Sequence, residues 1–130
     1  SPDADILEAL ALINETGYSQ IPIYDSGVFQ ALLTTNVIAR WVAADLSDDG
    51  VINGASISAV LTMAERKDRA EFLPRTATAQ EVIDVLTEPS ADGTHPSAVL
   101  LTEHGKPSQR PVAIATPADL ATLVDALEWE

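Results

Sequence analysis

The chain has 130 residues, 46% of them hydrophobic, which is enough for one domain or two very small repeats with a real core. Lys and Arg total 7 against 20 Asp and Glu, and the resulting net charge of −13 repels phosphate backbones and anionic lipids. Direct nucleic-acid binding and a membrane partner are therefore not expected. The lack of cysteine excludes disulfides, thiolate zinc sites and a Cys nucleophile, and it fits a cytoplasmic location.

Four elements are predicted in the first part of the chain. Residues 3–17 have apolar residues at helical spacing, with acidic residues in the first turn and Gly17 at the end. QIPIYD (20–25) and VFQALLT (28–34) flank a turn, which indicates a strand pair. NVIARWVAADL (36–46) predicts a second helix. The apolar stripe of this helix consists of Val37, Ile38, Trp41 and Val42.

The next segment, DLSDDGVINGAS (45–56), resembles an EF-hand calcium loop. Asp45, Ser47 and Asp49 occupy positions one, three and five, and Gly50 occupies position six. Position twelve is Ser56, where an EF-hand places a bidentate Glu. We therefore interpret the segment as a linker, with calcium binding as the weaker alternative and no metal required.

The second part of the chain repeats the first. After a short predicted helix in SISAVLTMAE (56–65), the sequence predicts a strand in AEFLP, a helix in RTATAQEVIDVLTE, strands in SAVLLTE and PVAIA, and a final helix in TPADLATLVDAL. In this alignment Ser19 corresponds to Ser97, Ile21 to Val99 and Thr34 to Thr116, and the second copy has a longer loop, EHGKPSQRP (103–111), between its strands. The predicted helix stripes of this copy are Val82, Val85 and Leu86, and Leu120, Leu123, Val124 and Leu127.

With these repeated segments, the chain resembles a tandem pair of CBS (cystathionine β-synthase) domains. The resemblance implies an α/β (α+β) fold of two β-α-β-β-α units related by a pseudo-twofold axis. We expect residues 1–46 to form the first unit, 47–69 the linker and short helix, and 70–130 the second unit. The strand ahead of the first helix is present only in the second copy, so we expect its counterpart upstream of Ser1.

The resemblance also implies where a ligand binds. CBS pairs bind adenosine-containing ligands through a Gly-hydrophobic-x-Thr-x-x-Asp run, which the second copy retains as residues 113–119, with alanine for the usual glycine. Asp119 would accept hydrogen bonds from the ribose hydroxyls and Thr116 would contact a phosphate. The first copy keeps Thr34 but has Val37 at the Asp position. The backbone around Ser19 to Ile21 and around Ser97 to Val99 would line the base.

We therefore expect a non-enzymatic, homodimeric sensor module. Its candidate ligands are AMP, ADP, ATP, S-adenosylmethionine and cyclic di-AMP, and the acidic charge disfavours ATP without a cation. Arg75 is the first candidate for phosphate contact and Arg40 the second. Two alternatives stay open: the Thr116 to Asp119 run is only a helix cap, and the fold is a ligand-free dimerisation module. His95 and His104 lack the neighbours of a metal or catalytic site.

Overall fold

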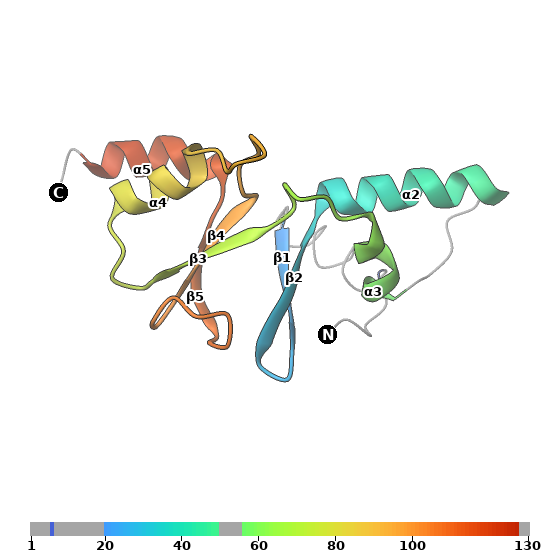
Figure 1. Ribbon diagram of the computed structural model, residues 1–130, viewed down its shortest axis with the longest axis horizontal. Coiled ribbons are helices and arrows are strands. Elements are labelled where there is room, and N and C mark those ends of the chain that lie inside the picture. The colour runs from blue at the N-terminus through green and yellow to red at the C-terminus, as the bar shows by residue number, and fades with distance from the viewer. Residues whose placement is uncertain (1–5, 7–19, 50–55, 128–130) are drawn as a thin grey trace.

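The computed structural model describes Ile6, residues 20–49 and residues 56–127, with only the backbone path of residues 45–49. Its first half begins with strands β1 (Gln20–Asp25) and β2 (Val28–Thr34), which pair antiparallel, and continues into helix α2 (Thr35–Asp49) (Figure 1). Ser26 and Gly27 both have positive φ, which matches the twist that a two-residue hairpin turn requires. The predicted strand pair and second helix are confirmed.

The second half contains the complete unit expected from the sequence. A short connection, α3 (Ile57–Val60) and the 3₁₀ turn η1 (Leu61–Met63), leads into it. The unit consists of β3 (Ala70–Pro74), α4 (Ala79–Thr87), β4 (Ala98–Thr102), β5 (Pro111–Ala115), η2 (Pro117–Asp119) and α5 (Leu120–Leu127). The strands form a sheet in the order β3-β4-β5, with β3 parallel and β5 antiparallel to β4. Both predicted helices and all three predicted strands of this copy are present.

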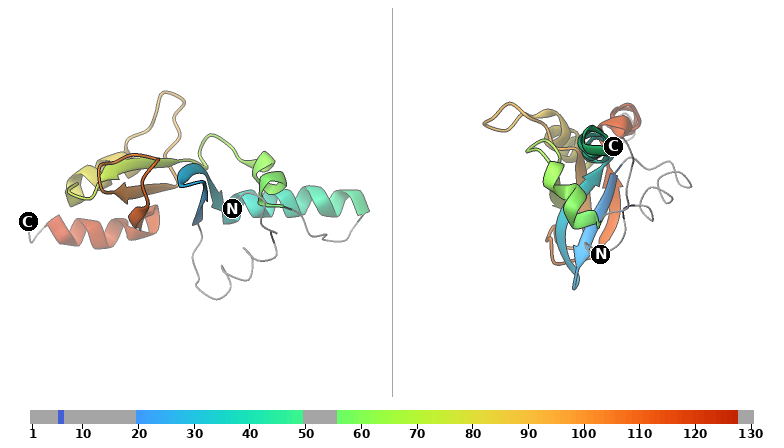
Figure 2. Two further views of the ribbon diagram at one scale, coloured as in Figure 1. Left: turned by 90° about the horizontal axis from the view of Figure 1, so that it is seen from below. Right: turned by 90° about the vertical axis from the view of Figure 1, so that its right-hand side faces the viewer.

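The two halves lie side by side along an elongated molecule. Helices α4 and α5 cover one face of the sheet, and α2 extends away from it, so that α2 and α5 lie at opposite ends (Figure 2). The β1–β2 hairpin lies next to the sheet between them. Phe29 of β2 contacts Phe72 of β3 edge to face, with 5.1 Å between ring centroids. The hairpin and the sheet are therefore in direct contact.

Each half has its own hydrophobic core. The first is built by the predicted stripe of α2 together with Ile6, Ile23, Leu33, Ile57 and Val60. The second joins Val82, Leu86 and Val99, with Val85, Leu120 and Leu123 packed against them. Trp41 is buried in the first core, as expected of an aromatic residue on a helix stripe. Ile6 is helical and fully buried, while the rest of the predicted helix 3–17 lies outside the described residues.

Three local expectations differ from the structure. Helix α2 runs through Asp49 and so includes residues 47–49 of the expected linker; the backbone at Asp45, Ser47 and Asp49 is helical, which does not fit the weaker alternative of a calcium loop. The single helix expected in 56–65 is α3 followed by the 3₁₀ turn η1. Val124 is 51% exposed, because α5 packs on the second core through Leu120 and Leu123 and turns Val124 away from it.

Candidate functional site

The end of the second sheet brings several of the predicted site residues together. In the antiparallel β4–β5 pair, Val99 lies opposite Ala115, so the start of β4 and the end of β5 share one end of the sheet. Ser97 directly precedes β4 and Thr116 directly follows β5. We call this region the Thr116 end. A hollow of about 330 Å³ lies beside it, lined by Leu86, Thr87, His95, Pro117 and Leu120.

Thr116 and Asp119 form a capping arrangement at the start of the final helical segment. The Oδ2 atom of Asp119 accepts hydrogen bonds from the backbone N–H of Thr116 at 2.8 Å and from its hydroxyl at 3.4 Å. Asp119 is exposed, and its Oδ1 accepts no hydrogen bond from any residue that the structure describes. A carboxylate has about four acceptor positions, so the cap leaves capacity for a ligand hydroxyl. Capping and ribose binding are therefore compatible at Asp119.

Ser97 and Val99 are held by the protein itself. The Ser97 backbone N–H donates to the carbonyl of Arg69 at 2.9 Å, and its hydroxyl donates to the carbonyl of Lys67 at 2.6 Å. The Val99 side chain is fully buried in the second core, so it cannot contact a ligand. At this position only the Ser97 side chain, which is half-buried, is within reach of a ligand.

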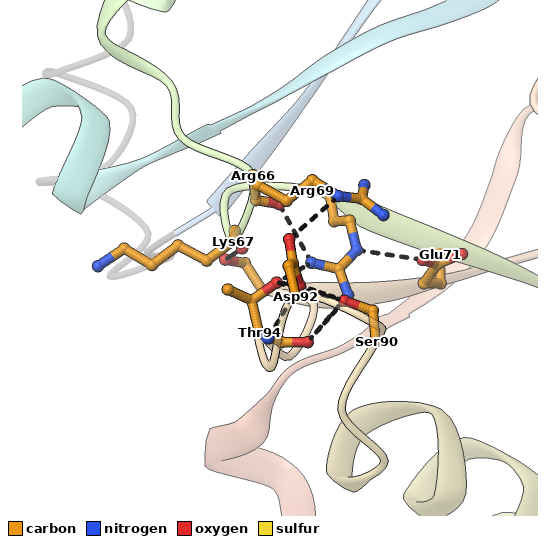
Figure 3. Close-up of polar contacts among 8 residues, drawn as sticks. Arg66, Lys67, Arg69, Glu71, Ser90, Asp92 and Thr94 are labelled. Atoms are coloured by element: carbon orange, nitrogen blue, oxygen red, sulfur yellow. Dashed lines mark hydrogen bonds and ion pairs between the residues drawn. The ribbon is translucent and has the colours of Figure 1, made fainter.

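A cluster around Arg69 fixes the segment that enters the second unit (Figure 3). Its guanidinium donates to the hydroxyl of Thr94 at 3.0 Å, to the carbonyl of Thr94 at 3.2 Å and to the carbonyl of Arg66 at 3.1 Å, and its Nε pairs with Glu71 at 3.2 Å. These bonds tie the loop between α4 and β4 to the segment before β3. Sequence reasoning missed this cluster; the turn signal Asp92-Gly93-Thr94 was its only local sign.

Asp92 is the charged centre of that loop. It accepts hydrogen bonds from the hydroxyls of Ser90 and Thr94 and from the backbone N–H of Thr94, and Arg66 lies 3.4 Å away. These hydrogen bonds, with a smaller contribution from Arg66, hold the pKa of the Asp92 carboxyl well below its usual range. The loop therefore carries a fixed negative charge near the Thr116 end.

The equivalent junction of the first unit is closed. The Thr34 hydroxyl accepts from the backbone N–H of Val37 at 3.1 Å and donates to Asp68 at 3.1 Å. Thr34 is 3% exposed and Val37 is fully buried. Asp68 also accepts from the backbone N–H of Glu65 at 2.8 Å and forms an ion pair with Arg40. Thr34 therefore acts here as a helix cap and an anchor for the linker.

The remaining predicted residues are spread over the molecule. Arg75 follows the far end of β3, at the opposite end of the sheet from Thr116, and pairs with Glu103 at 3.2 Å. Arg40 donates to the carbonyl of Met63 at 2.9 Å and pairs with Asp68, so it too is engaged by the protein. Ile21 is partly buried against the first core, and Ser19 lies outside the described residues. Arg75 therefore lies away from the Thr116 end, and Arg40 is held by the linker segment.

Residues 68 and 69 connect the junctions of the two units. Asp68 binds Thr34, and the carbonyl of the next residue, Arg69, accepts from the N–H of Ser97. The end of β2 and the start of β4 are therefore linked through two consecutive residues. A shift of residues 68 and 69 would therefore act on both the Thr34 junction and the start of β4.

Among the described residues, no three His, Asp or Glu side chains gather as a metal site would require. Nor is any of the described helices long and apolar enough to span a bilayer.

Comparison with known proteins supports the fold. The structure is similar to that of Staphylococcus aureus OpuCA, with a TM-score of 0.59 and 13% sequence identity, over 98% of this chain and 88% of the other. At this identity the likeness shows the fold alone, and it confirms the CBS-pair fold expected from the repeated segments. No protein-family model matches the chain. No curated protein matches it either.

Proposed function

We propose that the chain is a non-catalytic regulatory module that binds one adenosine-containing nucleotide at the Thr116 end of its second unit. The observation that carries the proposal is the exposed Asp119 carboxylate, which has an acceptor oxygen free of described partners; the next residue, Leu120, lines a hollow of about 330 Å³. Ribose presents two adjacent hydroxyl donors, and a carboxylate is the side chain best suited to accept from both.

The charges around this end favour a ligand with few phosphates. Arg66 and Lys67 belong to the segment that Ser97 contacts, and their side chains are 63% and 51% exposed. Each already has an acidic neighbour, Asp92 and Glu65 respectively. AMP, a nucleoside or a cyclic dinucleotide would therefore meet less repulsion than ATP, ADP or another polyphosphate without a cation. In this proposal Arg66 and Lys67 replace Arg75 as the candidates for phosphate contact.

The proposed output is a change in how the two units, or two protomers of a homodimer, are oriented. Residues 68 and 69 bind both junctions, so a ligand that moves Ser97 also acts on the contact between Asp68 and Thr34. The ligand must favour one arrangement over the other, because equal affinity for both shifts nothing.

A second candidate function is a ligand-free dimerisation module in the cytoplasm. It is favoured by the apolar residues of β5 that remain uncovered, since Val112 is 59% and Ile114 41% exposed. Exposed apolar residues on an edge strand are a common feature of surfaces that pair with another chain.

The two functions are separated by a thermal-shift panel of AMP, ADP, ATP, S-adenosylmethionine and cyclic di-AMP. A ligand at about a hundred times its Kd adds about 2.7 kcal/mol to the free energy of unfolding, which raises the Tm by several degrees in a domain of this size. The sensor function predicts a shift with one adenosine compound that Asp119→Ala abolishes.

The chain offers a matched control for that variant. Helix α4 begins with the same type of capping box, in which Glu81 accepts from the backbone N–H of Thr78 at 3.3 Å. Glu81→Ala should keep the full ligand-induced shift, because Glu81 has no proposed ligand contact. Equal loss in both variants, or no shift with any compound, would overturn the sensor function and leave the dimerisation module.

A further inference from the structure

A larger cleft lies where the tip of the β1–β2 hairpin meets the long loop before β5. Its volume is about 560 Å³, within the range of about 300 to 1,000 Å³ typical of small-molecule sites. It is lined by Pro22, Tyr24, Gly27, Ser108, Arg110 and Pro111. Gly27 follows β1 and Pro111 begins β5, so this cleft is at the opposite end of the strands from Thr116.

The loop that supplies Ser108 and Arg110 is well ordered by its own contacts. The side-chain oxygen of Gln109 accepts from the N–H of His104 at 2.8 Å and from the hydroxyl of Thr102 at 3.1 Å. Thr102 is fully buried and its hydroxyl accepts from the N–H of Lys106 at 2.8 Å. Gly105 has φ of +75°, and a Cβ there would lie 3.1 Å from the backbone nitrogen of Pro74. The loop therefore presents its side chains from a fixed backbone.

The cleft is also fixed across the two units. The backbone N–H of Phe29 donates to the carbonyl of Pro107 at 2.9 Å, which joins the hairpin to the loop. Tyr24 contacts Phe29 edge to face at 5.7 Å, and Phe29 contacts Phe72 in the same way at 5.1 Å. One wall comes from each unit, and an aromatic row holds the walls together, so the cleft is formed before any ligand arrives.

Tyr24 has an unmet hydrogen-bonding group at this cleft. Its Oη is buried and has no hydrogen-bond partner in the described part of the chain. A buried hydroxyl without a partner is unfavourable, because it has lost its hydrogen bonds to water and forms none within the protein. Burial raises the pKa of Tyr24, so the group is a neutral O–H donor at physiological pH. Tyr24 also lines the cleft, and a rotation of its side chain would bring the hydroxyl to a polar group of a molecule bound there.

The two cations without an ion pair to any described carboxylate are found in the loop beside this cleft. Of the 7 Lys and Arg, five form ion pairs with described carboxylates: Arg40, Arg66, Lys67, Arg69 and Arg75. Lys106 and Arg110 form none with any described carboxylate, and both belong to the loop beside the cleft. In a chain with a net charge of −13, a loop with two cations that no described carboxylate pairs is a local exception. They favour an anionic occupant.

We propose that this cleft binds a small anionic molecule with a flat apolar body, independently of the nucleotide proposed for the Thr116 end. Arg110 pairs with the carboxylate or phosphate, for which a guanidinium offers two parallel N–H donors. Ser108 and the Tyr24 hydroxyl bind polar groups of the ligand. The rings of Pro22, Tyr24 and Pro111 pack against its flat body.

The test uses four small probes and ¹⁵N-edited NMR of the full chain. Phenyl phosphate and benzoate carry the expected anion on a flat body, benzyl alcohol has the body without the charge, and inorganic phosphate has the charge without the body. We expect phenyl phosphate or benzoate to shift the amide signals of Gly27 and Ser108, and the two probes together show which anion the cleft prefers. Benzyl alcohol and inorganic phosphate should bind about tenfold more weakly or worse.

Three variants make the result specific. Arg110→Ala should weaken binding of the anionic probe about tenfold or more, because it removes a charge-assisted hydrogen bond. Arg75→Ala removes the same charge from an arginine that pairs with Glu103 outside the cleft lining, and it should leave binding unchanged. Tyr24→Phe should weaken binding while the free protein keeps or gains stability, since the lost hydroxyl had no described partner.

Three outcomes would overturn the proposal: no binding of either anionic probe at millimolar concentration, equal binding of benzyl alcohol, or equal affinity in Arg110→Ala. Asp119→Ala should leave this binding intact. A loss of probe binding in that variant would show that the signals come from the Thr116 end instead.

Discussion

The strand-to-helix junctions at Thr34 and Thr116 occupy the same position in the two repeats, but their surroundings are opposite. Thr34 is 3% exposed and bonded to Asp68, and the residue three positions on is the buried Val37. The junction after Thr116 carries the exposed Asp119, whose cap uses only one of its two oxygens. The same local motif therefore stabilises the fold in the first unit and remains accessible to a ligand in the second.

The two junctions differ in exposure because they make different structural contacts. The first junction anchors the linker, and three side chains, Arg40, Asp68 and Thr34, are committed to that contact. In the second unit the equivalent restraint comes from elsewhere, through Ser97 and the Arg69 cluster. Thr116 and Asp119 therefore need only to cap the helix. Duplication of one unit gives two equivalent positions, and burial decides which of them is available.

The largest effect is expected from introducing an acid at the position in the first unit that corresponds to Asp119. Val37→Asp places a carboxylate at a fully buried position and should cost about 4 kcal/mol or more of the free energy of unfolding. Val37→Asn, of similar shape and without charge, should cost less. Urea unfolding at neutral pH measures both. A stable Val37→Asp protein that binds a second nucleotide would contradict the closed state of this junction.

The next largest effect is expected at the linker anchor. Asp68→Ala removes a carboxylate whose side chain is 1% exposed and leaves Arg40, Thr34 and the N–H of Glu65 without it. Because Arg40 is 27% exposed and keeps some access to water, we expect a loss of about 3 kcal/mol in urea unfolding. Asp25→Ala, at an exposed strand end, is the control and should be near neutral. Equal midpoints for the two variants would contradict an anchoring role for Asp68.

A smaller effect distinguishes capping from ligand binding at the second junction. Asp119→Ala and Glu81→Ala each remove the acid of an exposed capping box and should each cost about 1 kcal/mol in the unliganded protein. Thermal unfolding without ligand measures this equality. A much larger loss in Asp119→Ala alone would mean that Asp119 has a structural role that its two described hydrogen bonds do not account for.

The smallest effect concerns pH. The pKa of Asp92 is depressed in the folded protein, so its contribution to stability is present above the unfolded pKa of about 4 and is lost as the pH falls below that value. Asp92→Asn should therefore be less stable than the wild type at pH 7 and pH 5, and the difference should narrow once the pH falls below about 4. Unfolding midpoints at pH 7, 5 and 3 test this. A constant gap would show that the carboxylate charge is not what stabilises the loop.

The fold was largely predictable from the sequence because it depends on local patterns that occur twice. Helical spacing in Val82, Val85 and Leu86 predicted the covered face of the second sheet, and the stripe of α2 predicted the first core. The failure at Val124 has a physical reason. Helix α5 contacts the second core through a narrow strip of its surface that leaves Val124 exposed, and the hydrophobic periodicity of a helix does not show how wide its buried strip is.

The candidate site was predictable only in part. Thr116, Asp119 and Ser97 come together because the β4–β5 register joins them, and the repeat contained that register. Arg75 could not be placed, because its end of the sheet depends on the direction of β3 relative to β4. The ion pair between Arg40 and Asp68 joins residues far apart in the sequence, and no local sequence pattern indicates it. The same holds for the burial of the Tyr24 hydroxyl without a described partner.

The central claim, that one junction is open and the other closed, is tested most directly by the stoichiometry of nucleotide binding. Isothermal titration of the wild type with the compound that gives the largest thermal shift should yield one site per chain. Asp119→Ala should remove that site, and Glu81→Ala should keep it. Two sites per chain, or one site that survives Asp119→Ala, would contradict the account.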